Sequence, residues 1–154
     1  MSSQAPDTAP DTAERQNWMG LLARAKAAHL AALLPDPLPD HSLLRAPEIG
    51  AVMVRGRAGA TGAPFNLGEM TVTRCSLRLA SGVVGHAVVQ GRDRAHARRA
   101  ATVDALMQTG EAAGVRARVL DALAEAEMAA RRDRAEKAAA TKVEFFTMVR
   151  GEDK

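Results

Sequence analysis

The segment from Val83 to Met107 constrains the fold of this chain more than any other. In V-V-G-H-A-V-V-Q-G-R-D-R-A-H-A-R-R-A-A-T-V-D-A-L-M, an apolar run of strand length ends at Gln90-Gly91, and Asp93 is placed to cap a helix. Helix starts expose unpaired backbone N–H groups and a partial positive charge, so they attract anions such as phosphate. Four polar residues crowd this junction, namely Arg92, Asp93, Arg94 and His96. The sequence therefore predicts a strand, a tight turn and a helix whose start is the first place to expect an anion.

The residues before this junction predict an antiparallel sheet of at least three strands. Residues 69–79 alternate, with Thr71, Thr73, Cys75, Leu77 and Leu79 on one face. A short turn at residues 80–82 leads into 83–90, so the two runs should pair as a hairpin. Residues 51–55 predict a further strand, with an irregular entry at residues 45–48. We expect Cys75 to face the core, where a thiol behaves as a small hydrophobe.

The glycine-rich stretch G-R-A-G-A-T-G-A-P, residues 56–64, separates two of these strands. A phosphate-binding loop of the Walker type needs Lys followed by Ser or Thr after its last glycine, and this stretch has neither. It therefore predicts a flexible hairpin connection, in which Thr61 remains a candidate for a hydroxyl contact to a ligand.

Residues 1–11 are small, polar and rich in proline, which predicts a disordered leader before a single domain over residues 12–154. Asp11 and Glu14 then stand at capping-box spacing. One helix should follow and stop at Pro35. Its apolar stripe is Trp18, Leu21, Leu22, Ala25, His29, Ala32 and Leu33. Trp18 is expected to be an anchor, either in the core or at an interface.

Two further helices are predicted after Gly91. The first runs from Arg94 to about Thr109 with Gly110 as its C-cap, and the second covers roughly residues 115–141. The apolar face of the second helix is Val119, Leu120, Leu123 and Met128, and its i,i+4 ion pairs are Glu127–Arg131 and Asp133–Lys137. The predicted fold class is α+β: an N-terminal helix, the antiparallel sheet, two C-terminal helices and a terminal extended segment.

The terminal segment V-E-F-F-T-M-V-R-G, residues 143–151, is unusually apolar for a chain end. Phe145, Phe146, Met148 and Val149 need burial, because an exposed patch of this kind marks an interaction site. The segment either returns to this domain's sheet as a strand or docks into another subunit, and the sequence leaves both open.

Composition excludes several classes of protein. The net charge is only +3, and aromatic residues, which stack on bases in many nucleic-acid complexes, make up only 3% of the chain. Both observations argue against a nucleic-acid-binding module. The single Cys75 excludes an internal disulfide framework, and no apolar run reaches membrane-spanning length, so we expect a cytoplasmic protein with no membrane partner. No ligand spacing for a metal is present, since the four histidines lie on separate predicted elements: His29, His41, His86 and His96.

Catalytic groups are sparse. No serine or cysteine is paired with a base, and the acid–base candidates are Glu48, Asp93 and His96. Asp93 is expected to be a helix cap and His96 to hydrogen-bond its surroundings. Arg92 is the stronger anion candidate, because a guanidinium matches phosphate oxygens and the helix start lies beside it.

Several stretches, taken in order, resemble the PhnG family, the G subunit of the carbon–phosphorus lyase core complex of bacterial phosphonate metabolism. They are R-Q-N-W-M-G-L-L-A (15–23), R-A-P-E-I-G (45–50), G-A-T-G-A-P-F (59–65), T-V-T-R (71–74), V-Q-G-R-D-R-A-H-A (89–97), D-A-L-M-Q (104–108) and F-F-T-M-V-R-G (145–151). The resemblance covers residues 12–110 and 142–152; the leader and residues 111–135 match poorly.

This resemblance implies an accessory subunit without catalytic residues or a cofactor of its own. Its partners would be the H, I and J subunits and, transiently, an ATPase-like L subunit. The complex would transfer methylphosphonate to the ribose of MgATP, its substrate, and release adenine as it forms ribose 1-methylphosphonate 5-triphosphate. Partner contacts are then expected at Trp18, Phe145, Phe146 and Met148, and a phosphorus-containing ligand or a partner loop at Arg92 and His96. The residues themselves also suggest an alternative to the accessory role: a small stand-alone enzyme that binds nucleotide phosphates with Arg92, Asp93 and His96.

Overall fold

The computed structural model of the protein describes residues 10–142, which form an α+β fold, as predicted. In chain order the elements are α1 (Thr12–Arg24), α2 (Ala27–Leu33), β1 (His41–Arg57), the short 3-10 turn η1 (Ala58–Ala60), β2 (Pro64–Leu79), β3 (Val84–Gln90), α3 (Arg94–Leu106), α4 (Ala112–Val115), the π-helical turn η2 (Arg116–Leu120) and α5 (Asp121–Ala140).

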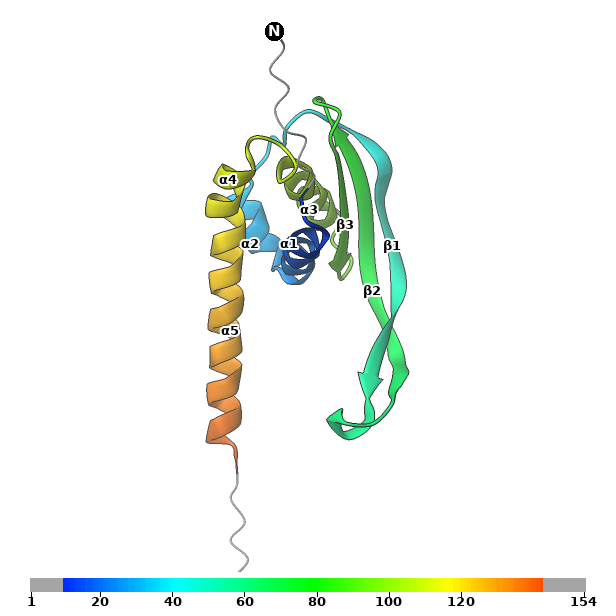
Figure 1. Ribbon diagram of the computed structural model, residues 1–154, viewed down its shortest axis with the longest axis vertical. Coiled ribbons are helices and arrows are strands. Elements are labelled where there is room, and N and C mark those ends of the chain that lie inside the picture. Colours follow the sequence, from blue (N-terminus) through cyan, green and yellow to red (C-terminus); the bar gives the residue numbers. More distant parts are fainter. Residues whose placement is uncertain (1–9, 143–154) are drawn as a thin grey trace, which may run out of the picture.

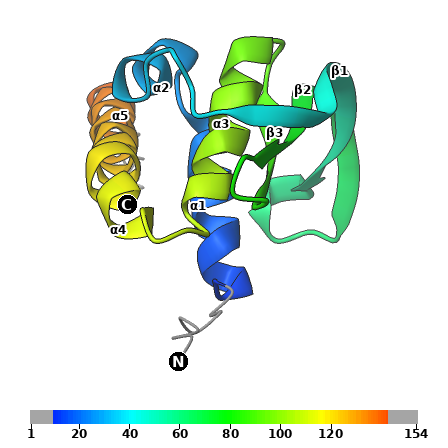
Figure 2. The same ribbon diagram turned by 90° about the horizontal axis from the view of Figure 1, so that it is seen from above.

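A three-stranded antiparallel sheet in the order β1-β2-β3 carries the helices on one of its faces (Figures 1 and 2). Helix α3 packs directly on β3 and β2, and α1 packs on β3 beside it. The hairpin of β2 and β3 is paired as predicted, with Cys75 opposite Ala87. Cys75 is 1% exposed on the helix side of the sheet, and this burial raises the pKa of its thiol. The thiol therefore stays protonated and packs as a small apolar group.

Strands β1 and β2 continue past the end of β3. The β2–β3 register ends at Val72 and Gln90, whereas the β1–β2 register runs on to Arg57 and Pro64. Residues 51–71 therefore project from the core as a two-stranded hairpin arm, whose tip is the connection predicted at residues 56–64 (Figure 1). Helix α5 projects from the side of the core opposite the hairpin arm (Figure 1). Leu123, near its start, is the one residue of this helix that is buried. We call its residues 124–140 the helical arm.

The prediction of one continuous N-terminal helix is wrong, because this region forms two helices, α1 and α2. Ala25 and Lys26 have extended backbone dihedrals, which break the helix between α1 and α2. The carbonyl of Leu22, which would accept a bond from Lys26 in a continuous helix, accepts one from Nε2 of His96 at 2.9 Å instead. Asp11 is the N-cap residue, but its side chain makes no capping bond, and Glu14 pairs with Arg116.

The two later helices also differ from prediction in detail. Helix α3 ends at Leu106 and not near Thr109, because the side chain of Thr109 donates to the Leu106 carbonyl at 2.7 Å as the chain turns. The second helical region is present, with the pair Asp133–Lys137 at 2.9 Å and Glu127–Arg131 at 3.6 Å, as predicted. Met128 was predicted on its buried face and is 55% exposed, since α5 has left the core by that residue.

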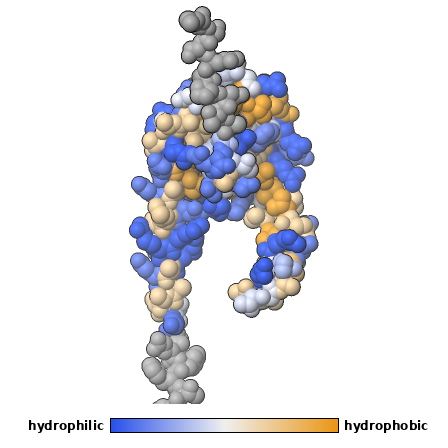
Figure 3. All heavy atoms as spheres, viewed as in Figure 1, coloured by the Kyte–Doolittle hydropathy of each residue, from blue (hydrophilic) through white to orange (hydrophobic). Residues whose placement is uncertain are grey.

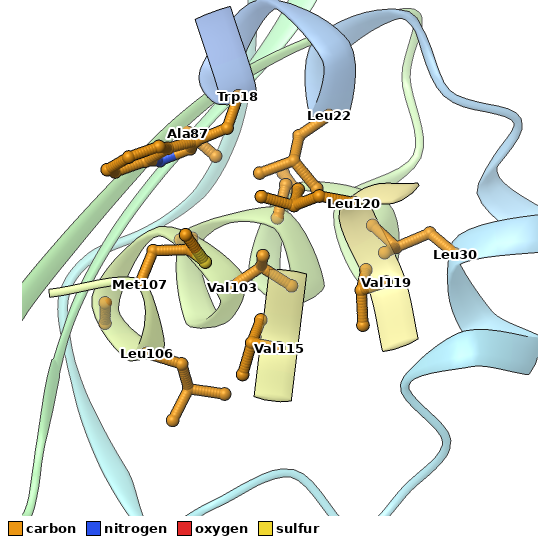
Figure 4. Packing of buried hydrophobic residues seen from close by; sticks show 14 of the residues in the cluster. Trp18, Leu22, Leu30, Ala87, Val103, Leu106, Met107, Val115, Val119 and Leu120 are labelled. Carbon is orange, nitrogen blue, oxygen red and sulfur yellow. The ribbon is translucent and has the colours of Figure 1, made fainter. Parts of the chain in front are cut away.

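Small residues bring the layers of the core close together. Helix α3 contributes four of its five alanines to the core, and Leu22, Leu30, Val103, Val115 and Leu120 fill the spaces between helices (Figure 4). Gly85 of β3 marks the tightest approach: a Cβ there would lie 2.0 Å from the carbonyl oxygen of Ala101 and 2.7 Å from the backbone nitrogen of Ala105. Strand and helix backbones are therefore in direct contact at this point.

A buried carboxylate beside this contact joins three elements. Asp104 of α3 is fully buried, and its oxygens accept bonds from Nε and Nη2 of Arg15 at 3.1 and 2.7 Å and from Nε1 of Trp18 at 3.0 Å. They also accept the backbone N–H of His86 in β3 at 2.9 Å. Trp18, expected in the core or at an interface, is 3% exposed in the core. One side chain thus fixes α1 and β3 relative to α3.

We predict that Gly85→Ala lowers the free energy of unfolding by about 1–3 kcal/mol, because the new methyl group forces β3 away from α3. Urea unfolding followed by circular dichroism measures the change. The control is Gly68→Ala in β2, where a Cβ meets nothing within 4 Å; equal losses in the two variants would show that the close approach is not required.

We predict that Asp104→Asn lowers the free energy of unfolding by about 3–5 kcal/mol, because it removes a buried charge partner and turns an amide N–H₂ toward groups that are all donors. Asp133→Asn, which breaks the exposed pair with Lys137, should cost no more than about 0.5 kcal/mol. A difference of less than about 1 kcal/mol between the two variants contradicts the central role of Asp104.

Candidate functional site

The junction between β3 and α3 has the geometry expected of a capped helix start. Gly91 adopts a φ of +91°, and its carbonyl accepts the hydroxyl of Thr73 at 2.8 Å. Asp93 is the N-cap residue, and its Oδ1 accepts the backbone N–H of His96 at 2.9 Å, so the predicted cap is confirmed. Arg92 and the flanking residues 93–94 are exposed. Arg92 is therefore open to an anion, while the carboxylate of Asp93 occupies part of the helix start.

His96 points away from this surface. Its side chain lies in the core, where the residue is 3% exposed, and because a carbonyl can only accept, Nε2 carries the proton in its bond to Leu22. Burial lowers the pKa of His96 below its ordinary value, while the bond to Leu22 and the charge of Asp93 act in the opposite direction and offset this only in part. His96 is thus a neutral histidine that closes the break between α1 and α2, and it does not face the same space as Arg92.

The other basic and hydroxyl candidates are spread apart. Arg99 turns toward the end of α2, where it bonds the Leu34 carbonyl and Asp36. Arg98 is half-buried, and within residues 10–142 no partner bonds its Nε. Thr61 lies at the tip of the hairpin arm, beyond the end of β3, and its hydroxyl bonds Gly59. The structure therefore does not bring Thr61, Arg92 and His96 together.

A groove that the sequence did not reveal lies next to the junction. It has a volume of about 540 Å³ and is bounded by α1, the α1–α2 break, α5 and Gln90 at the end of β3. Three cations line it: Arg24, Lys26 and Arg134. Arg24 donates to Glu127 across the groove at 2.7 Å, and this bond lowers the pKa of Glu127, which stays ionised. No local sequence motif predicts this group of residues, because Arg24 and Lys26 are about a hundred residues away from Glu127 and Arg134 in the chain.

The hairpin arm and the β1 edge carry an apolar surface. In the arm, Met53, Phe65 and Leu67 are 55%, 45% and 65% exposed, and along β1 the chain also exposes Leu43, Leu44 and Ile49. Figure 3 shows apolar residues along this limb, on the side of a hollow opposite the helical arm. Of the predicted partner contacts, Trp18 is buried in the core, and Phe145, Phe146 and Met148 lie outside the described residues.

Within residues 10–142, no cluster of three or more histidine, cysteine or acidic side chains has the arrangement of a metal site. None of the helices in this part of the chain has the length and apolar character needed to span a membrane.

Comparison with known proteins gives two concordant results. The family model described as phosphonate metabolism protein PhnG matches residues 13–151. The chain is also 50% identical, over 148 residues, to the alpha-D-ribose 1-methylphosphonate 5-triphosphate synthase subunit PhnG of Rhizobium meliloti (strain 1021), with 92% of each chain covered.

We predict that His96 makes the protein less stable as the pH falls. The unfolded chain binds a proton at His96 near the ordinary value of 6.5, while the folded chain binds it only at lower pH. The free energy of unfolding therefore falls below about pH 6.5, with a slope of at most about 1.4 kcal/mol per pH unit from this group. Urea unfolding between pH 7.5 and pH 5.5 measures it.

His96→Gln should remove this part of the pH dependence, because a glutamine amide still donates to Leu22 but does not titrate in this range. His41→Gln, the same substitution at a histidine outside the core, is the matched control for the chemical change itself. A wild-type slope in the His96→Gln protein would show that the buried ring does not titrate as described.

Proposed function

We propose, from the premise that the chain belongs to the PhnG family of phosphonate metabolism proteins, that it is a subunit of alpha-D-ribose 1-methylphosphonate 5-triphosphate synthase. The complex transfers methylphosphonate to the ribose of MgATP and releases adenine. This chain is the accessory member, with no cofactor of its own, and works in the cytoplasm. Its partners are the H, I and J subunits and, transiently, the ATPase-like L subunit.

The exposed hairpin arm is the observation that carries the accessory role. A small protein on its own rarely exposes a contiguous set of large apolar side chains, and such a surface marks a protein interface. Met53, Phe65 and Leu67 lie on the hairpin arm, which leaves the core, and they stay exposed among the described residues. A partner subunit that covers the arm removes this surface from water. The apolar segment with Phe145 and Phe146 provides a second contact in this proposal.

The alternative, a stand-alone enzyme built on Arg92, Asp93 and His96, has less support. Such a site needs all three groups to reach one ligand, whereas Asp93 caps the helix and His96 is buried behind it. Incubation of the isolated chain with MgATP and methylphosphonate separates the two hypotheses. An accessory subunit releases no adenine without its partners, whereas a stand-alone enzyme releases adenine by itself.

The arm is tested by serine substitutions, with a methionine outside the arm as the control. Met53 and Met128 are equally exposed, one on the hairpin arm and one on α5. In cells that co-express the H, I and J subunits, we expect Met53→Ser combined with Leu67→Ser to weaken co-purification about tenfold or more, since truncating a central apolar contact costs roughly 1–2 kcal/mol or more. Met128→Ser should co-purify as the wild type does.

Circular dichroism of the isolated variants checks that the fold is retained. Normal assembly of the Met53/Leu67 double variant would remove the arm from the interface, and a wild-type chain that binds none of the three subunits would overturn the proposed function. Phe145→Ala with Phe146→Ala tests the second contact in the same assay, where unchanged assembly rejects it.

A further inference from the structure

The groove between α1 and α5 lies at the base of the hollow that separates the two arms. In Figure 1 the helices α1 and α2 bridge the space between α5 and the sheet, and below them the two limbs extend side by side. Figure 3 shows the same space as a hollow in the molecular surface. At about 540 Å³, the groove is an open recess in this surface, continuous with the exposed inner side of the helical arm.

The groove combines an apolar floor with a cationic rim. Its floor consists of aliphatic side chains, namely Leu21, Ala25, Leu123, Ala126 and Ala130. The rim carries Arg24, Lys26 and Arg134, and of the described residues that line it Glu127 alone is acidic. Arg24 already bonds Glu127 at 2.7 Å, and Arg131 lies 3.6 Å from the same carboxylate. The charge of Arg134 also acts on Glu127, so this one carboxylate faces several cations, and the rim keeps an excess of positive charge that includes Lys26.

The α5 side of the groove has the spacing of a helix-packing surface. Leu123, Ala126, Ala130 and Arg134 follow one another at intervals of three and four residues, so they lie along one stripe of the helix. Alanine in this stripe allows a second helix to approach to the short end of the usual interaxial range, about 8 Å. A helix laid along the stripe would place its apolar side on the floor and its flank beside Lys26 and Arg134.

We propose that this groove binds an amphipathic helix of a partner subunit whose flank is acidic. This inference rests on the proposed function, because it needs a partner. Charge complementarity selects the occupant: carboxylates meet the excess cations of the rim, and the helix-in-groove arrangement buries the apolar floor. A second copy of this chain fits poorly, since an isologous contact would set Lys26 and Arg134 of one copy against the same cations of the other.

Lys26 allows a direct test in the assembled complex. A carbodiimide joins an amine to a carboxylate that it touches, so treatment of the co-expressed complex followed by mass spectrometry should link Lys26 to Asp or Glu in a helical segment of a partner. Lys26→Arg keeps the charge and the assembly, and it should lose the link. Absence of any link from Lys26 in an assembled complex overturns the inference, as does a link only to Glu127 or to Glu144, Glu152 or Asp153 of the same chain.

A second test compares two arginines of α5. Arg134 lines the groove, whereas Arg132 does not line it and lies in a neighbouring recess with Met128 and Ala129. We expect Arg134→Glu to weaken binding of the partner at least about tenfold, more at low salt than at high salt, because like charges then face each other. Arg132→Glu should change binding less than about twofold. Equal effects of the two changes overturn the inference, while failure of the wild-type complex to form overturns the proposed function as well.

Discussion

The carboxylate of Asp104 organises the arrangement of this fold. An ionised group that is fully buried is costly unless every lone pair finds a donor, and here the donors come from three directions: the guanidinium of Arg15, the indole of Trp18 and the backbone N–H of His86. Because those donors belong to α1 and β3, satisfying the charge fixes both elements against α3. Gly85, the residue before His86, lacks the side chain that would keep β3 away from α3.

A second polar contact shapes the N-terminal region in the same manner. When α1 ends, the carbonyl of Leu22 loses its helical donor, and the ring of His96 replaces it inside the core. The break at Ala25 and Lys26 lets α2 turn across α3, where Leu30 is fully buried. The same break brings Lys26 and Arg24 to the edge of α5. His96, a ligand candidate in the sequence, thus has a structural role: its ring bonds the Leu22 carbonyl at the break between α1 and α2.

The compact part of the molecule is small, and two limbs extend from it. The hairpin arm keeps large apolar side chains in water, and none of the residues of the helical arm is buried. A chain of this kind gains stability when other surfaces cover its limbs, which agrees with the relative that is named as a subunit of a synthase. The low aromatic content fits the same pattern, since alanine and glycine supply close packing but little buried area per residue.

Local sequence determined the elements, and tertiary structure determined the sites. Alternation over residues 69–90, the glycine turn at 80–82 and the cap at Asp93 predicted the hairpin and the start of α3, because each depends on neighbours within a few residues. The break between α1 and α2 was missed because the donor to the Leu22 carbonyl is His96, which is 74 residues away in the chain. The end of α3 was placed too late because the hydroxyl of Thr109 bonds the Leu106 carbonyl as the chain turns. The role of Asp104 and the cations of the groove were also invisible: Arg15 and Arg24 meet partners 89 and 103 residues away, and no spacing along the chain encodes a contact that exists only after the helices pack.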